Sequence, residues 1–84
     1  MLYQRLTATN DVNGNPRRLI VFYDADGGNL VRIADEGYAG SGRTRIVAEL
    51  AEMGLDPLTR TTELSSVEIT TAEYRRLLRA HALR

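Results

Sequence analysis

The chain has 84 residues, 43% of them hydrophobic, and its 11 basic residues balance 11 acidic ones. A chain of this length supports one modest hydrophobic core, so residues 1–84 are expected to form a single domain without room for a complete nucleotide-hydrolysing sheet. The absence of cysteine excludes disulfides and thiolate metal sites, and the neutral charge argues against a protein that binds nucleic acid mainly through its phosphates.

Three strands are predicted in the first half of the chain. Residues 2–9 alternate between two faces, as in a strand with one covered side. After a loop rich in Asn, Gly and Pro at 10–16, residues 18–24 are apolar on both faces and predict a central strand covered above and below. A turn over DADGGN leads into a third strand at 29–35, and the short connections predict an antiparallel meander.

An amphipathic helix is predicted over residues 43–53. Its apolar stripe consists of Ile46, Val47, Leu50 and Met53, whereas the polar side carries Arg45, Glu49 and Glu52. Gly54 stands just past the helix, where glycine adopts left-handed geometry at little cost. We therefore expect the helix to end there and Leu55 to fold back onto Leu50.

The next segment, residues 58–69, predicts a fourth strand because it is rich in β-branched side chains. Leu64 and Val67 are three positions apart, however, and fall out of phase with a regular strand. We expect a bulge or break near Ser65 and Ser66, since an extra residue restores the phase.

A second helix is predicted at the end of the chain. It begins with a capping box, in which Thr70 accepts a hydrogen bond from the Glu73 amide while the Glu73 side chain reaches back. One face of this helix carries Tyr74, Leu77 and Leu78, and the other carries Arg75, Arg76 and Arg79.

Together these elements predict an α+β fold in the order βββαβα. The expected architecture is an antiparallel three-strand meander plus a crossover strand, with two helices packed mainly on one sheet face. The opposite face would then be partly open, and an open apolar face on a small domain often marks a protein partner or a homodimer surface. The partner-binding residues expected from this arrangement are Tyr3, Arg5, Tyr23 and Tyr38.

The sequence predicts a cytoplasmic location without a membrane role. The chain opens on the polar segment MLYQRLTATND, which lacks the apolar stretch of a signal peptide. Its longest apolar run, Leu19–Tyr23, is far shorter than the about 20 residues that cross a bilayer.

The glycine-rich segment GYAGSGRT, residues 37–44, resembles a phosphate-binding loop with arginine in place of the usual lysine. Glycine amides and a helix N-terminus attract anions, so the candidate anion-binding residues are Gly40, Gly42, Arg43 and Thr44. The preceding strand belongs to a meander, and no apolar strand ends in an aspartate that would position magnesium. We therefore expect a sharp strand-to-helix turn capped by Ser41 or Thr44, with phosphate or nucleotide binding as the lesser alternative.

The sequence offers no catalytic or metal-binding constellation. His81 is the only histidine, so neither a catalytic triad nor a zinc site can be assembled around it. The turns DADGGN and DVNGNP depart from calcium loops, because Asn29 and Pro16 occupy the position that requires glycine. We expect a protein without cofactor or metal that is not an enzyme.

Arg75, Arg76 and Arg79 form a second candidate surface, on the exposed side of the last helix. Arginines near a helix C-terminus complement the helix dipole and solvate the face. They could also contact phosphates or an acidic protein surface, and Tyr3 or Tyr38 could stack on a base. Nucleic-acid binding is therefore the alternative function.

Residues 21–54, VFYDADGGNLVRIADEGYAGSGRTRIVAELAEMG, resemble in element order the hairpin, glycine loop and helix of HicB-like antitoxins. The resemblance implies a small partial ribonuclease-H fold that binds a toxin partner and self-associates, but it covers less than half of the chain and carries over no functional residue. The residues themselves predict an intracellular, non-enzymatic module that docks on another protein, as a regulator or inhibitor, with a homodimer as one form.

Overall fold

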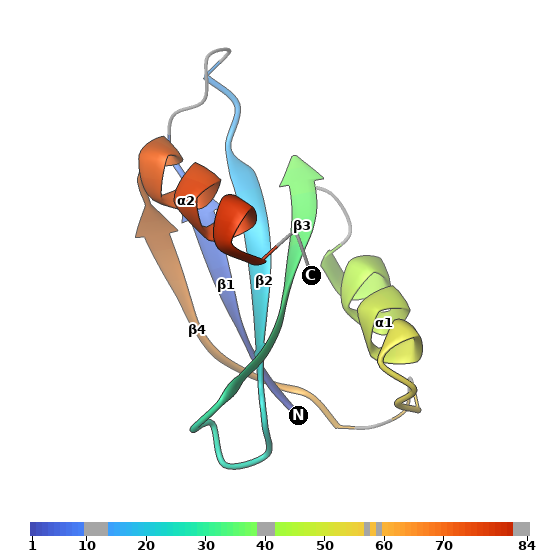
Figure 1. The fold of residues 1–84 in the computed structure, drawn as a ribbon. Coiled ribbons are helices and arrows are strands. Elements are labelled where there is room, and N and C mark those ends of the chain that lie inside the picture. The colour runs from blue at the N-terminus through green and yellow to red at the C-terminus, as the bar shows by residue number, and fades with distance from the viewer. Residues whose placement is uncertain (10–13, 39–41, 57, 59, 82–84) are drawn as a thin grey trace.

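The computed structural model describes residues 1–9, 14–38, 42–56, 58 and 60–81 (Figure 1). These residues form a four-stranded mixed sheet and two helices in the order βββαβα, as the sequence predicts. The elements are β1 (Leu2–Ala8), β2 (Arg17–Tyr23), β3 (Leu30–Tyr38), α1 (Gly42–Glu52), β4 (Thr62–Ile69) and α2 (Thr71–His81). Among the described residues, no helix is long and apolar enough to cross a bilayer.

The sheet has the strand order β3-β2-β1-β4. The first three strands pair antiparallel, which confirms the predicted meander, and β4 joins the sheet beside β1 and parallel to it. The connection through α1 therefore runs from one edge of the sheet to the other. This arrangement makes β2 and β1 the two inner strands.

Strand β2 is buried on both of its faces. Leu19 and Val21 point to one side, where they pack with β1 and with Tyr74 of α2, and are 0% and 2% exposed. Ile20 and Phe22 point to the other side and are both 0% exposed. There they pack in a second cluster with Ala34, Ile46 and Leu50. Burying each large apolar side chain stabilises the fold by about 1.5–3 kcal/mol, so both clusters depend on this strand.

The two helices cover opposite faces of the sheet, and the prediction that they pack mainly on one face is wrong. In Figure 1, α2 crosses in front of β1 and β2, whereas α1 lies beside β3. The physical reason is the alternation of side chains along a strand, which sends Leu19 and Phe22 to different sides. Each of these faces needs its own cover, so α2 packs with the Leu19 cluster and α1 with the Phe22 cluster.

Strand β3 extends further than the predicted residues 29–35, because a bulge carries it through to Tyr38. Arg18 pairs with Gly37, whereas the next residue along β2 pairs with Asp35, which leaves Glu36 as the extra residue. Gly37 has φ of +73°, a left-handed angle that glycine adopts readily. Gly37, the first glycine of the segment GYAGSGRT, therefore belongs to the strand.

Strand β4 contains the bulge that the out-of-phase leucine and valine predict. Tyr3 pairs with Glu63 and Gln4 with Ser65, so Leu64 is the unpaired extra residue, next to the predicted position. The strand begins at Thr62, and the predicted start at residue 58 is wrong.

Helix α1 ends as the sequence predicts. Gly54 adopts φ of +77°, and the Leu55 amide donates to the Leu50 carbonyl at 2.9 Å. Leu55 packs against the cluster that contains Leu50, as expected. The cap fixes where the chain leaves the helix toward β4.

The N-terminus of α2 has half of the predicted capping box. The Glu73 amide donates to Thr70 Oγ1 at 3.1 Å. The Glu73 carboxylate accepts from Arg76 Nε at 3.0 Å, and this contact replaces the predicted return bond to the Thr70 amide.

Glu49 is buried, although the helical pattern places it on the polar side of α1. It is 1% exposed. Arg32 Nε of β3 lies 2.7 Å from its Oε2, at an angle too poor for a hydrogen bond, and Arg45 Nη2 lies 2.9 Å from its Oε1. Arg32 also pairs with Glu52, which is 60% exposed. Two guanidiniums thus compensate a carboxylate that would otherwise be costly to bury.

We predict that Glu49→Gln lowers the free energy of unfolding by about 1–3 kcal/mol, since it leaves Arg32 and Arg45 without their shared charge. The matched variant Glu52→Gln removes an exposed partner of Arg32 and should cost less than about 1 kcal/mol. Urea unfolding of both variants gives the comparison. Equal losses would show that the burial of Glu49 carries no energetic weight.

Candidate functional site

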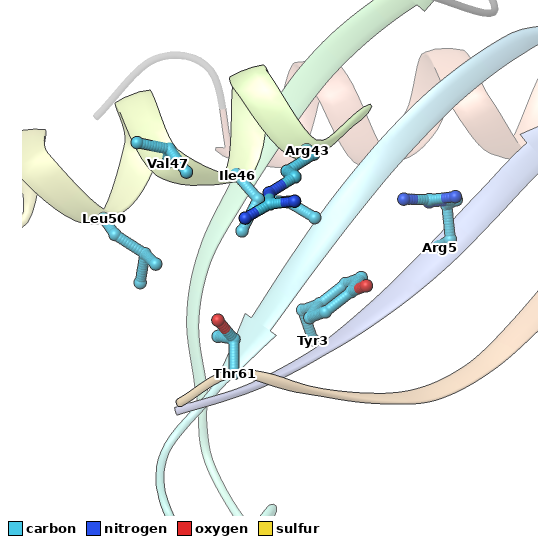
Figure 2. Close-up of a pocket in the computed structure, with 7 residues that line it drawn as sticks. All are labelled: Tyr3, Arg5, Arg43, Ile46, Val47, Leu50 and Thr61. Carbon is cyan, nitrogen blue, oxygen red and sulfur yellow. The ribbon is translucent and has the colours of Figure 1, made fainter. Parts of the chain in front are cut away.

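A groove of about 340 Å³ lies between α1 and β1 (Figure 2). One wall is the helix and the other is the strand, and the view in Figure 2 shows their side chains facing each other across the groove. The lining residues are Tyr3, Arg5, Arg43, Ile46, Val47, Leu50 and Thr61. The groove therefore combines an apolar wall with an aromatic and cationic one.

The helix wall follows from the amphipathic pattern of α1. Ile46 and Leu50 are 7% and 1% exposed because they pack onto the Phe22 cluster. Val47 lies beside them and stays partly exposed to the groove. Arg43 lies one turn earlier on the helix, and its guanidinium lines the groove near Ile46 (Figure 2).

The strand wall follows from the register of the sheet. Tyr3 pairs with Phe22 and Arg5 with Ile20, so both point to the face that α1 covers. The Tyr3 ring lies 6.5 Å from the Phe22 ring, and the Arg5 guanidinium lies 6.0 Å from the Tyr3 ring centroid. Tyr3 thus has one side in the core and one side in the groove.

A hydrogen-bonded chain holds the tyrosine hydroxyl. Tyr3 donates to Glu63 Oε2 at 3.1 Å, and Ser66 Oγ donates to Glu63 Oε1 at 2.5 Å. Burial raises the pKa of the Tyr3 hydroxyl above its ordinary value, and the bond to the Glu63 carboxylate raises it further. The bond from Ser66 lowers the pKa of Glu63. The hydroxyl is therefore neutral, and its hydrogen is already donated to Glu63.

The four residues predicted to bind a partner do not share one surface. Tyr3 and Arg5 line the groove, but Tyr23 packs with the cluster under α2. Tyr38 is 51% exposed, and its ring lies 5.4 Å from the Arg17 guanidinium. That guanidinium also lies 5.1 Å from the ring of Tyr74 in α2, so Tyr38 belongs to the α2 side.

The predicted anion-binding set is divided as well. Gly40 lies outside the described residues, and Gly42 is the first residue of α1. Arg43 and Thr44 are exposed in the first helical turn. Only Arg43 lines the groove, which joins it to Tyr3 and Arg5 instead of to the glycine loop.

The arginines of α2 also separate. Arg75 and Arg79 line a shallow hollow of about 490 Å³ together with Ala72 and Leu78. Arg76 forms an ion pair with Glu73 on its own helix. Two of the three arginines thus remain as a candidate nucleic-acid contact.

Two aspartates outside the groove, Asp35 and Asp24, have structural partners. Asp35 accepts a hydrogen bond from the Tyr74 hydroxyl and lies 3.2 Å from Arg17 Nη2. Asp24 Oδ1 accepts from the Gly28 amide at 3.0 Å, as turn chemistry predicts. Within the part of the chain that the structure describes, no three histidine or acidic side chains gather to hold a metal ion.

Sequence reasoning missed three contributors to the groove: Val47 as a binding wall, Thr61 and the bond from Tyr3 to Glu63. The helical stripe assigns Val47 to the core, where its neighbours Ile46 and Leu50 do lie. Glu63 is brought to Tyr3 only by the parallel pairing of β4 with β1, and no local pattern encodes that register.

No protein-family model, curated protein or solved structure matches this chain. The resemblance in element order to HicB-like antitoxins therefore gains no support from these comparisons.

We predict that the pKa of the Tyr3 phenol lies above its ordinary value of 10.0. The difference in near-ultraviolet absorbance between the wild type and Tyr3→Phe, recorded across alkaline pH, measures this pKa. Glu63→Gln should lower this pKa, though not to the ordinary value, because burial persists. Glu68→Gln, a charge change in the same strand, should leave it unchanged. An equal shift in both variants would contradict the specific bond.

The sign of the linked stability follows from the raised pKa. The contribution of Tyr3 to stability is fully present below its unfolded pKa of about 10 and is lost as the pH rises through the higher folded value. Unfolding measured across that alkaline range should show a smaller loss in Tyr3→Phe than in the wild type.

Proposed function

We propose that this chain is a cytoplasmic, non-enzymatic docking module whose groove between α1 and β1 receives an extended segment of a partner protein. The groove itself carries the proposal, because it sets the partly exposed Val47 opposite Tyr3 and Arg5. Tyrosine and arginine are enriched where protein interfaces bind tightly. A partner side chain that packs on Val47 would be desolvated between them.

The dimensions and charge of the groove favour a segment of chain over a folded surface. Its about 340 Å³ accommodates a few side chains, and both Arg5 and Arg43 lack an ion pair among the described residues. An extended segment can place an apolar side chain against the helix wall and a polar one beside these guanidiniums. The module would then act on its partner by occupying that segment, as a regulator or inhibitor.

Nucleic-acid binding at α2 is a second candidate. It is favoured by the hollow in which Arg75 and Arg79 flank Leu78, since two guanidiniums can contact the phosphates and the base faces of a single strand. The two candidates use opposite faces of the sheet, so variants can separate them.

We predict that Val47→Glu and Tyr3→Ala reduce capture of the partner from host extract by about tenfold or more, because both alter the centre of the groove. Ala48→Glu is the matched control, since Ala48 is an exposed neighbour on α1 outside the groove. Circular dichroism must show that all three variants fold. A protein kept by the wild type and by Ala48→Glu but lost by Val47→Glu supports the proposal.

The same capture identifies other occupants. Equal retention by Val47→Glu and Ala48→Glu would contradict docking at the groove. Material that disappears after nuclease treatment and depends on Arg75 and Arg79 would favour the second candidate. Recovery of an untagged copy of this chain, lost in Val47→Glu, would make the occupant a second copy.

A further inference from the structure

We infer that the partner segment is acidic and that its carboxylates bind a cluster of three arginines, Arg5, Arg18 and Arg43, on the open part of the α1 face. The inference rests on the proposed docking function, and it names the chemistry of the occupant. Arg5 and Arg43 line the groove. Arg18 extends the cluster beyond the groove along β2.

The register of the sheet places Arg18 on the same face as Arg5. Arg5 pairs with Ile20, and Arg18 precedes Ile20 by two residues on the same strand. Side chains two apart on a strand share a face, so Arg18 points to the α1 side with Ile20. Diagonal neighbours of this kind on adjacent strands lie about 7–8 Å apart, which allows two guanidiniums to contact one short segment.

These arginines differ from those that the fold uses for its own ion pairs. Arg17, Arg32, Arg45 and Arg76 each pair with a carboxylate. In the described part of the chain, no carboxylate lies in ion-pair range of Arg5, Arg18 or Arg43. The Nε atoms of Arg5 and Arg18 are moreover buried without a hydrogen-bond acceptor. Arg17 Nε is buried in the same way on the α2 side, so the feature that sets Arg5 and Arg18 apart from Arg17 is the absence of an ion pair.

Three acidic residues, Glu36, Glu63 and Glu68, share this face with the arginines. Glu63 is occupied by its bonds to Tyr3 and Ser66. The Glu36 carboxylate lies close enough to Tyr3 to raise the pKa of its hydroxyl, and both of its oxygens are buried without a donor. Glu68 pairs with Thr7, which also pairs with Arg18, so it lies on this face as a third carboxylate. The acidic partner is therefore favoured by three guanidiniums without ion pairs, and not by an excess of positive charge on the face.

A carboxylate-bearing peptide fits the groove better than a polyanion does. The partly exposed Val47 gives a partner side chain an apolar contact that phosphates and sugars do not use. Carboxylates form short, paired hydrogen bonds with the planar guanidinium group. The chain as a whole has no positive excess, whereas phosphate-dependent binding usually relies on one.

The test uses two end-blocked peptides, Gly-Glu-Leu-Glu-Gly and its neutral counterpart Gly-Gln-Leu-Gln-Gly, added to the full chain labelled with nitrogen-15. The arginine Nε–H resonances report each guanidinium separately. We expect the acidic peptide to shift the resonances of Arg5, Arg18 and Arg43, with an affinity about tenfold higher than that of the neutral peptide. The resonances of Arg75 and Arg79 should stay in place.

Variants and an inorganic probe complete the test. Arg43→Gln should weaken the acidic peptide by about tenfold, whereas Arg79→Gln, an exposed arginine on α2, should leave its affinity unchanged. Equal affinity for the two peptides would overturn the acidic partner and leave docking intact. Inorganic phosphate that shifts the three arginines more strongly than the acidic peptide, at matched ionic strength, would also overturn it.

The two proposals fail in different ways. If neither peptide shifts any groove resonance, the proposal of an acidic partner is overturned. The docking proposal is then decided by whether Val47→Glu and Ala48→Glu differ in the amount of partner that they capture. If the neutral peptide binds at Val47 and the acidic one does not, the groove is a docking site for an uncharged segment.

Discussion

The structure depends on one strand, β2, that is apolar on both faces. Both faces must be covered, and the described residues form two helices of 11 residues each to cover them. A helix is about 10 Å in diameter and strands lie about 4.8 Å apart, so one helix covers about two strands. With one helix on each face of four strands, each face stays partly bare. On the face that α1 covers, the sheet surface left uncovered begins at β1. The groove lies where the covered part of this face meets the uncovered part.

The ion pair between Glu49 and Arg32 determines which side of α1 faces that groove. Glu49 faces Arg32 of β3, while Ile46 and Leu50 pack onto the centre of the sheet. Successive helical residues are rotated by about 100°, so Val47 lies on the flank away from Glu49 and toward β1. The buried charge therefore orients the helix, and the apolar wall of the groove follows from that orientation.

The local patterns of the sequence predict the elements, the central strand, the β4 bulge and the end of α1 at Gly54, because each depends on neighbouring residues. They fail for features that depend on contacts between residues distant in the chain. The face of each helix, the burial of Glu49 beside Arg32 and the bond between Tyr3 and Glu63 require the sheet order and register. Of the candidate site, Tyr3 and Arg5 could be predicted, since alternation alone places both on one side of β1.

The placement of the two helices is the central claim, and a single spin label tests it most directly. The chain has no cysteine, so Val47→Cys offers one attachment point for a nitroxide. Paramagnetic broadening should be strongest at the β1 amides of Tyr3 and Arg5 and weaker at Leu77 and Leu78 of α2, across the sheet. Equal or stronger broadening of α2 would put both helices on one face and remove the groove.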